Sequence, residues 1–293
     1  MKGIILAGGN GTRFRPSTFG VSKHLLQVYD KPMIYYSISL LFLAKIKDIL
    51  LICKSDDLDS YKNLLGDGSY FGVKISYEVQ NQPNGIAEAL LIGERFIGKS
   101  NFCLILGDNF FFGHRVPMIL QKASRNILGA NILTFESNTP QDFGVVYFDK
   151  KEKPIKIVEK PKDGKSNSVI PGIYFYSSEV IRYVKKMQKS ARGELEITDL
   201  NKILLNKKKL KVFKMGRGIA WLDMGDPERL NAASNFVRSV QANQGFLISC
   251  LEEISLNNKW IEPKELNKNI DKLKLSTDYY KYLKKLISDK KLK

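Results

Sequence analysis

Residues 2–13 read Lys2-Gly-Ile-Ile-Leu-Ala-Gly-Gly-Asn-Gly-Thr-Arg13, a short apolar run that passes directly into a glycine-rich segment. The apolar run predicts a buried strand, and the glycines after it let the backbone turn tightly with its N–H groups close to an anion. Arg13 adds a guanidinium, which can bind phosphate oxygens in a bidentate manner. This stretch therefore predicts a phosphate-binding loop at the end of the first strand.

The segment after the glycines excludes two common nucleotide motifs. No Gly-Lys-Ser/Thr closes the loop, so it is not a P-loop, and no helix opens directly after it, as the dinucleotide fingerprint requires. Pro16 and Lys23 instead lie in a long irregular segment, and helical spacing begins only near Pro32. A long ordered loop of this kind usually carries function. An ordinary glycine-rich turn after the first strand of an α/β protein is the alternative.

The first half of the chain alternates apolar strand-like runs with helical patterns. Such alternation is typical of an α/β fold in which a mostly parallel, mixed sheet carries helices on both faces. Sites in these sheets lie off the carboxyl ends of the strands. The predicted strands are Ile4–Leu6, Ile49–Cys53, Ile75–Val79 and Cys103–Leu106, and the predicted helices cover 32–45, 56–65 and 85–96.

The second half changes character. Strand-like runs follow closely on one another, which predicts hairpins and some antiparallel pairing. From Asp226 onward helical spacing dominates, with Leu230, Ala233 and Val237 on one apolar face. We therefore expect a core over residues 1–225 and a helical C-terminal extension over residues 226–293. The strand-like runs are Ile132–Phe135, Val145–Phe148, Ile155–Glu159 and Ile173–Tyr176, and two helices are predicted at Ser178–Lys186 and Glu196–Leu205.

Composition narrows the class of protein. The 293 residues are 43% apolar and 11% aromatic, as in a packed globular protein. The formal charge of +17 comes mostly from lysines spread along the chain, without helix-turn-helix or aromatic-interleaved context, which favours solvated lysine faces over nucleic-acid binding. No apolar run reaches membrane-spanning length. Glycine interrupts the N-terminal apolar run too early for a signal peptide, so we expect a cytoplasmic protein. Cys53, Cys103 and Cys250 lie in apolar runs without a CxxC pair, so we expect buried, reduced thiols.

Two carboxylates far apart in the chain follow predicted strands. Asp108 comes after the run that ends at Leu106, and Asp223 comes after Trp221 and Leu222. Two acidic groups beside a phosphate-binding loop would repel the phosphates unless a hard cation lies between them. The alternative is that each aspartate is a helix N-cap, since a helix is predicted shortly after Asp223.

Two further segments place positive charge near the ends of predicted elements. Pro161 ends the strand-like run that carries Glu159 and can determine the direction of Lys160, whose point charge suits a phosphate. A surface ion pair is the alternative for this lysine. Residues 190–199, which include Arg192, read on their own as the capped start of a helix.

These segments together resemble the signature of the sugar-1-phosphate nucleotidyltransferases, and within that family the resemblance is to the glucose-1-phosphate thymidylyltransferases. It runs essentially from end to end of the chain and implies a Rossmann-like mixed sheet with a helical C-terminal extension, usually in a homotetramer. The segments that carry it are 2–13, Asp30-Lys31-Pro32-Met33, Leu65-Gly66-Asp67-Gly68, Gly107-Asp108-Asn109, Phe143-Gly144-Val145-Val146, Glu159-Lys160-Pro161, Ser190–Asp199, Met215-Gly216-Arg217-Gly218 and Ala233-Ser234-Asn235-Phe236.

The resemblance also implies roles for individual residues. The nucleotide phosphates would be held by Gly8, Gly11, Thr12, Arg13 and Lys23, and the base by Gln80 and Gly85. The sugar side would be lined by Asn109, Gly144, Glu159, Lys160, Tyr174, Arg192 and Trp221, with Lys160 and Arg192 at the sugar phosphate. The ligands of a bound Mg²⁺ would be Asp108 and Asp223, and the catalytic set would be Arg13, Lys23, Asp108, Lys160 and Asp223.

The implied reaction is transfer of a thymidylyl group from dTTP to glucose 1-phosphate, giving dTDP-glucose and pyrophosphate at the start of dTDP-deoxysugar (rhamnose-type) synthesis. The attacking phosphate is already ionised, so positioning and charge neutralisation suffice. The chain has only two histidines, His24 and His114, which disfavours a mechanism that depends on histidine as a general acid or base. The alternatives are a uridylyltransferase, a non-catalytic nucleotide-sugar sensor and a basic nucleic-acid-binding protein.

The chain departs from the family pattern near the expected base pocket. His24 and Gln27 stand where the family usually has Gln and Pro, and Asn84 and Glu88 replace the usual Asp and Gln. These departures leave base selectivity open. Phe112 in place of a tyrosine, and Leu256-Asn257-Asn258 in place of Phe-Arg-Lys, fall where the family has a separate site for feedback inhibition, so we expect weaker inhibition.

Overall fold

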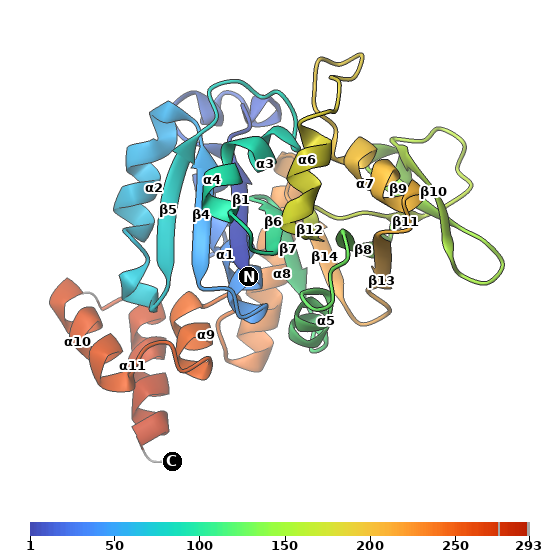
Figure 1. Cartoon of the computed structure of the whole chain (residues 1–293). Helices are drawn as coiled ribbons and strands as arrows, with labels where there is room; N and C mark the ends of the chain where they lie inside the picture. Colours follow the sequence, from blue (N-terminus) through green and yellow to red (C-terminus); the bar gives the residue numbers. More distant parts are fainter. Residues whose placement is uncertain (275, 292–293) are drawn as a thin grey trace.

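The first apolar run forms β1 (Lys2–Ala7), the strand around which the sheet is built in the computed structural model, which describes residues 1–274 and 276–291. β1 pairs in parallel with β4 and with β6, and β5 pairs in parallel with β4. These are the strands predicted from the first half of the sequence, and their carboxyl ends lie at one edge of the sheet (Figure 1). The bounds are β4 Asp48–Cys53, β5 Lys74–Val79 and β6 Phe102–Leu106.

The second half of the chain extends the same sheet with antiparallel pairs, as expected. β12 (Ile173–Tyr176) pairs antiparallel with both β6 and β8 (Ala130–Glu136). The strand order of this sheet is β10-β9-β11-β8-β12-β6-β1-β4-β5, with β13 parallel to β8. The remaining bounds are β9 Gly144–Phe148, β10 Pro154–Glu159, β11 Ser168–Val169 and β13 Leu210–Lys214, of which β11 and β13 were not predicted.

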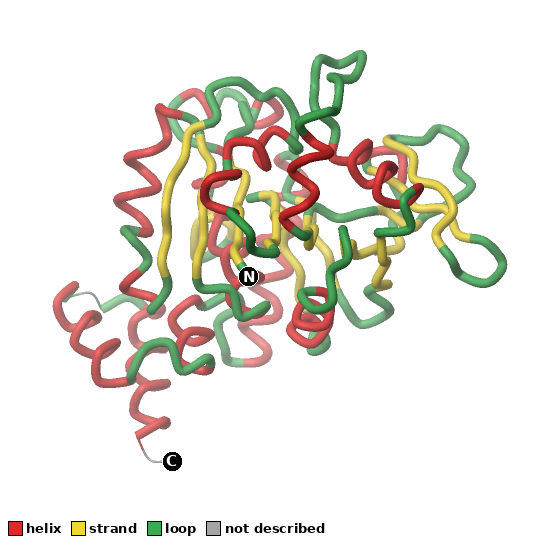
Figure 2. Tube along the Cα trace, in the orientation of Figure 1, coloured by secondary structure: helices red, strands yellow, loops and turns green. Residues whose placement is uncertain are grey.

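Helices cover both faces of the sheet, which confirms the expected layers (Figures 1 and 2). One apolar core joins the sheet to helices whose buried residues include Ile34, Ile38 and Leu120. The other core joins the opposite face to helices that carry Leu90 and Leu200. The helices of the first core are α1 Met33–Leu43, α2 Leu58–Leu65, α5 Val116–Ala123 and α9 Leu251–Asn257, and those of the second are α3 Glu88–Ile92, α4 Glu94–Ile97, α6 Ile181–Val184 and α7 Ile197–Asn206.

The helical extension begins with α8 (Pro227–Gln244), whose first turn is capped by Asp226. Its predicted apolar face is buried, because Ala233 and Val237 pack in one cluster with Met33 and Phe110. α10 (Pro263–Leu273) and α11 (Asp278–Lys291) follow α9 at the end of the molecule away from the glycine-rich segment (Figure 1). The division into parts at residues 225 and 226 stays a prediction, and residues 275, 292 and 293 of the extension lie outside the described residues.

Two small ladders complete the fold, and one of them positions the site. β7 (Asn109–Phe112) pairs antiparallel with β14 (Ala220–Asp223), so that Asp223 lies opposite Asn109 although they are far apart in sequence. β2 (Gln27–Val28) pairs with β3 (Lys31–Pro32). The 3-10 helices are η1 Thr12–Phe14, η2 Ser17–Phe19, η3 Lys23–Leu25, η4 Ser55–Asp57, η5 Ser69–Phe71, η6 Pro140–Asp142 and η7 Ser178–Val180.

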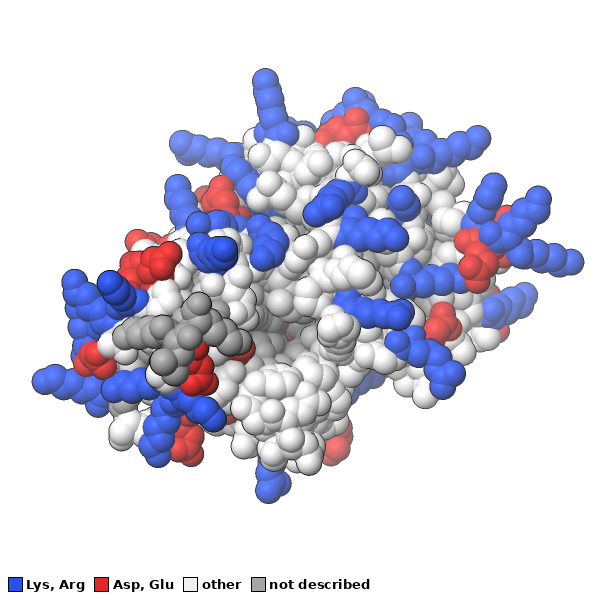
Figure 3. Space-filling view, turned by 90° about the horizontal axis from the view of Figure 1, so that it is seen from below, with Lys and Arg blue, Asp and Glu red and all other residues white. Residues whose placement is uncertain are grey.

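The distribution of charged side chains on the surface agrees with the expectation that the lysines are solvated and spread over the molecule. On the face shown in Figure 3, Lys and Arg side chains are spread around the rim and mixed with Asp and Glu, without forming a single strip. Within the described ranges, none of the helices combines the length and the apolar character needed to cross a bilayer.

Candidate active site

The glycine-rich loop leaves β1 at Ala7 and is ordered by contacts of its own. Gly11 has a φ of +57°, in the left-handed region that glycine adopts without strain. Its carbonyl accepts a hydrogen bond from Thr18 Oγ1 at 2.8 Å. A methyl group at position 11 would also lie only 2.9 Å from Cγ2 of Thr18. The loop therefore depends on glycine at this position for both its backbone conformation and its packing.

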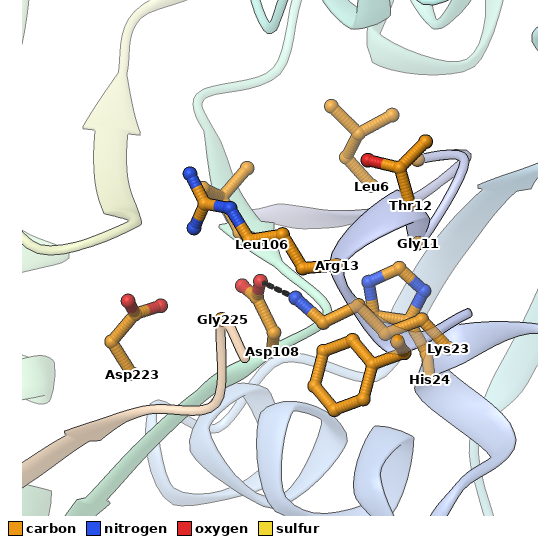
Figure 4. A pocket seen from close by; sticks show the side chains of 12 residues that line it. Leu6, Gly11, Thr12, Arg13, Lys23, His24, Leu106, Asp108, Asp223 and Gly225 are labelled. Atoms are coloured by element: carbon orange, nitrogen blue, oxygen red, sulfur yellow. Dashed lines mark hydrogen bonds and ion pairs between the residues drawn. The ribbon is translucent and has the colours of Figure 1, made fainter. Parts of the chain in front are cut away.

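A cavity of about 300 Å³, the glycine-loop pocket, opens beside this segment. It brings together six of the predicted site residues: Gly11, Thr12, Arg13, Lys23, Asp108 and Asp223. The two carboxylates lie on opposite sides of a space toward which the Arg13 guanidinium extends (Figure 4). Among the described residues, Arg13 has no hydrogen-bond or ion-pair partner, so its donors are available to an anion.

Asp108 lies where the chain passes from β6 to β7. Its Oδ2 is 2.5 Å from Nζ of Lys23, which the long loop brings back to the strand end. Burial opposes ionisation of Asp108, but the charge and hydrogen bond of Lys23 outweigh it and hold the pKa of this carboxyl below its ordinary value. Asp108 is therefore ionised at neutral pH.

Asp223 ends β14 and faces Asp108 across the pocket. Burial, and next the charge of Asp108, raise the pKa of Asp223 to about 6. Arg229 opposes that rise, because its Nη1 lies 2.8 Å from Asp223 Oδ2. A cation between the two carboxylates would relieve their repulsion, and the described residues offer no third His, Cys, Asp or Glu to join them.

The helix-cap alternative for these aspartates is wrong. The N-cap of α8 is Asp226, whose Oδ1 accepts the backbone N–H of Arg229 at 2.9 Å. Asp223 lies three residues earlier, at the end of a strand. Asp108 is followed by β7 and not by a helix. Both carboxylates are therefore free of a capping role.

A second cavity of about 300 Å³, the β9–β10 pocket, adjoins the first and shares Leu106 and Asp223 with it. Within it, Asn109 Oδ1 accepts hydrogen bonds from the Trp221 indole at 2.8 Å and from the Gly172 backbone at 3.2 Å. The pocket brings together all seven residues predicted for the sugar side: Asn109, Gly144, Glu159, Lys160, Tyr174, Arg192 and Trp221.

Lys160 and Glu159 are held differently at the rim of the β9–β10 pocket. Lys160 has a φ of +47°, a conformation that costs a non-glycine residue about 1–3 kcal/mol, and its N–H donates to the Phe143 carbonyl at 2.9 Å. Within the described ranges it forms no ion pair, so the surface-pair alternative is wrong. Glu159 instead accepts a hydrogen bond from Thr198 Oγ1.

Arg192 lies in a loop and not at a capped helix start. α7 begins at Ile197 after Glu196 and has no side-chain cap, so the interpretation of residues 190–199 as the capped start of a helix is wrong. The Arg192 Nη2 is 2.9 Å from Glu196 Oε1 and 3.7 Å from Glu159 Oε1. The guanidinium is thus kept at the pocket by two carboxylates.

Three predicted residues, Gly8, Gln80 and Gly85, are not in the lining of either cavity. Gln80 follows β5, is 5% exposed and lies against Gly8 across the strand ends. Gly85 lies against the backbone of Leu195, beside the loop that carries Arg192. Gly9 and Ile86, the chain neighbours of Gly8 and Gly85, line the glycine-loop pocket and the β9–β10 pocket respectively.

His24 is buried in the glycine-loop pocket beside Lys23. Burial lowers its pKa to about 4, so the ring is neutral at physiological pH. Its Nδ1 has no hydrogen-bond partner among the described residues. The neutral ring leaves Lys23 and Arg13 as the positive charges of this pocket.

Sequence reasoning missed two residues that hold the site together. Arg229 binds Asp223, Asp142 and Asp226, and Thr198 binds Glu159. The spacing Asp226-Pro-Glu-Arg229 signals a helix start, but nothing in it indicates a bond to Asp223. That contact depends on β14 pairing with β7.

Comparison with known proteins places this site in a family. The family model described as nucleotidyl transferase matches residues 2–240. A glucose-1-phosphate thymidylyltransferase of Neisseria meningitidis serogroup A is 48% identical over 287 residues, covering 98% of this chain and 99% of its own. One of Mycolicibacterium smegmatis is 45% identical with the same coverage.

Solved structures agree with this match. A Bacillus anthracis crystal structure, assigned as a glucose-1-phosphate thymidylyltransferase and in complex with sucrose, is 40% identical. It aligns with a TM-score of 0.75 and covers 81% of this chain and 95% of its own. A UDP-glucose pyrophosphorylase bound to UDP-glucose aligns with a TM-score of 0.72 at 23% identity, covering 82% of this chain and 98% of its own, which is a likeness of fold alone.

Proposed function

This chain belongs to the nucleotidyl transferase family, and we propose that it transfers a thymidylyl group from dTTP to glucose 1-phosphate, giving dTDP-glucose and pyrophosphate. The observation that carries the proposal is the identity of 48% with a glucose-1-phosphate thymidylyltransferase along nearly the whole of both chains. Two adjoining pockets support it, because each is lined by positively charged side chains: Arg13 and Lys23 in one, and Lys160 and Arg192 in the other. The product would feed dTDP-deoxysugar synthesis of the rhamnose type.

The glycine-loop pocket suits the triphosphate. Backbone N–H groups of the loop, together with Thr12, Arg13 and Lys23, would hold the phosphate oxygens. Arg13 is free to do so. Lys23 is paired with Asp108, and its ammonium group would have to bind a phosphate oxygen in addition to, or in place of, that carboxylate. Gln80, directly after β5, and Gly85, in the loop before α3, would hold the base.

The β9–β10 pocket suits the sugar phosphate. Lys160 and Arg192 would bind its phosphate, and Glu159 would accept hydrogen bonds from sugar hydroxyls. Gly144, Asn109, Tyr174 and Trp221 would shape the sugar site, where the Trp221 indole N–H already donates to Asn109.

In the reaction, an oxygen of glucose 1-phosphate forms a bond to the α-phosphorus of dTTP. The bond from that phosphorus to the oxygen bridging to the β-phosphate breaks, and pyrophosphate leaves with the electron pair. No proton has to move, in agreement with a neutral His24. The residues of this chain therefore act by orienting the two substrates and neutralising charge.

The residues present fit a divalent cation, which we propose to be Mg²⁺. Asp108 and Asp223 face one space, and their mutual repulsion contributes to the raised pKa of Asp223. Mg²⁺ usually takes one or two protein carboxylates and leaves its other positions to water and phosphate. When bound, the ion would neutralise charge on the phosphates.

The test is a matrix of four nucleoside triphosphates against several sugar 1-phosphates, with pyrophosphate release as the readout. We expect dTTP with glucose 1-phosphate to be used best, and UTP to be a weaker substrate. Thymine and uracil differ by one methyl group, which is worth about 1–3 kcal/mol in an apolar pocket. Equal or better use of ATP or CTP would contradict the base assignment, and no pyrophosphate release would favour a sensor.

We also propose a homotetramer in the cytoplasm. The resemblance supports the assembly, and three buried free cysteines, Cys53, Cys103 and Cys250, support a reducing compartment. Light scattering coupled to size-exclusion chromatography would test the assembly. A monomer at micromolar concentration would contradict it.

A further inference from the structure

Gln80 spans the gap between the glycine-rich loop and α3. Its Oε1 lies against Gly8, where a methyl group would come within 3.0 Å of that oxygen. Its Nε2 donates to Glu88 Oε2 at 2.6 Å. The two ends of this amide therefore have different neighbours, with the acceptor at the loop and the donor at the helix.

Glu88 determines that orientation. Its other oxygen, Oε1, accepts the side-chain amide of Asn84 at 2.8 Å. A carboxylate offers only acceptors, so it can bind the NH₂ group of Gln80 but not its carbonyl. Turning the Gln80 amide over would place an oxygen against the Glu88 carboxylate and leave a donor facing Gly8. The carboxylate thus permits one orientation of Gln80 and penalises the other.

Asn84 holds Glu88 in place from the far side. The Oδ1 of Asn84 accepts from Lys189 Nζ at 3.0 Å, which orients this amide also with its NH₂ toward Glu88. The Asn84 carbonyl accepts the backbone N–H of Leu195 at 2.7 Å, and the Leu195 carbonyl accepts that of Ala87 at 3.1 Å. Donors therefore approach the Glu88 carboxylate from both sides, Asn84 on one side and Gln80 on the other.

We propose that Glu88 is a positioning residue for base selection: it holds Gln80 with its carbonyl oxygen as the acceptor for an imide N–H. The inference rests on the proposed function, in which Gln80 contacts the base. Thymine and uracil present a donor at N3, which the Gln80 oxygen accepts. The second hydrogen of the Gln80 amide remains available for a base carbonyl. Cytosine presents a lone pair at N3 and meets an acceptor there.

The discrimination that Glu88 provides should be strong between cytosine and thymine and absent between thymine and uracil. A polar site built for one hydrogen-bond pattern rejects a base that lacks it, because its buried groups are left unpaired. Thymine and uracil share the imide edge, so Glu88 has no means of separating them. This contrast distinguishes positioning of Gln80 from general damage to the pocket.

The experiment compares kcat/KM for dTTP, dCTP and dUTP in the wild type and in Glu88→Gln. A glutamine at 88 can turn either end of its amide toward Gln80, so both orientations of Gln80 become accessible. We expect the dTTP-to-dCTP ratio to fall by about tenfold or more, and the dTTP-to-dUTP ratio to stay within about twofold of wild type. Glu94→Gln, the same chemical change in α4, should leave both ratios unchanged.

A double variant provides the rescue. In Asn84→Asp with Glu88→Gln, the carboxylate at 84 would bind the NH₂ of the new glutamine and turn its carbonyl toward Gln80. Gln80 would then again donate from its NH₂ group to residue 88 and keep its carbonyl oxygen for the base, so the dTTP-to-dCTP ratio should return to within about threefold of wild type. Should Glu88→Gln fold poorly by thermal unfolding, Glu88→Met, which offers no carboxylate, replaces it with the same expected fall.

The possible results distinguish a failure of the role proposed for Glu88 from a failure of the proposed thymidylyltransferase activity. An unchanged dTTP-to-dCTP ratio in a folded Glu88→Gln variant would overturn the role of Glu88. An equal loss with all three triphosphates, without rescue in the double variant, would also overturn it. If the wild type itself does not use dTTP with glucose 1-phosphate, the proposed function fails instead.

Discussion

Arg229 donates from Nη1 to Oδ2 of Asp223 at 2.8 Å, from the first turn of α8 to the last residue of β14. The same guanidinium reaches Asp142 Oδ2 at 2.5 Å and Asp226 Oδ2 at 3.2 Å. Asp142 lines the β9–β10 pocket, and Asp223 lines both pockets. One side chain therefore links Asp223, the proposed metal ligand, to Asp142 in the pocket proposed for the sugar phosphate.

Replacing Arg229 with Met should weaken metal binding more than it harms the fold. Asp223 would lose its charge partner and its orientation, and residues that orient metal ligands typically contribute 10–100-fold in metal affinity. We expect the Mg²⁺ concentration at half-maximal activity, and the Mn²⁺ dissociation constant measured by electron paramagnetic resonance, to rise by about that factor. Arg238→Met, at an exposed position of the same helix, is the control. Unchanged Mn²⁺ affinity in Arg229→Met would contradict the role.

The two carboxylates proposed to bind the metal, Asp108 and Asp223, should behave as one unit. Asp108→Asn and Asp223→Asn should each lower turnover by about three orders of magnitude, and the double variant should be scarcely worse, because residues that act together give non-additive losses. Steady-state pyrophosphate release checks this. A loss below about tenfold in either single variant would remove that residue from the metal site.

The stability of the ligand-free protein should respond oppositely to the two substitutions. The folded-state pKa of Asp223 is raised to about 6 from 3.8, so stability from this group falls as pH rises from about 4 to about 6. Above that window the ionised carboxylate costs on the order of 1–3 kcal/mol, and Asp223→Asn should raise the melting temperature. Asp108→Asn should lower it, because Asp108 has a lowered pKa and Lys23 would lose its partner.

Thermal unfolding of variant and wild type at pH 7.5 and pH 4 checks these signs. The gain in Asp223→Asn should shrink at pH 4, where the wild-type carboxyl is protonated in the folded state. His24, whose pKa is lowered to about 4, adds stability as pH rises through the same window. The comparison is therefore made between proteins at each pH. An Asp223→Asn gain that is equal at both pH values would contradict the assignment.

Metal activation should weaken in acid. A metal ligand has to be deprotonated, and the pKa of Asp223 is raised to about 6, so protons compete with the metal below that pH. The half-saturating Mg²⁺ concentration should be flat from pH 7 to 8 and rise by up to about tenfold per pH unit below 6. Mn²⁺ titration at pH 5.5 and 7.5 gives the same comparison without turnover. Equal affinities would show that Asp223 is not a ligand.

Local patterns were enough to predict most elements of the fold. Apolar runs of strand length, separated by helical spacing, predicted β1, β4, β5 and β6 and the helices between them, because each such run must be buried on both faces. β7, β11 and β13 are among the strands that these patterns did not predict. Asn109–Phe112 directly follows another apolar run, and its partner, Ala220–Asp223, lies more than a hundred residues away.

The sequence by itself determined the residue chemistry of this protein: a glycine-rich loop with Arg13, carboxylates at Asp108 and Asp223, and a lysine before Pro161. These follow from residue type and short-range spacing. Only the tertiary structure decided which groups meet. The β7–β14 pairing brings Asp223 beside Asp108, Arg229 joins Asp223 to Asp142, and Glu88 orients the Gln80 amide. Hydrogen bonds and charge interactions act over a few ångströms, so distances between residues remote in sequence are set by how the sheet and helices pack.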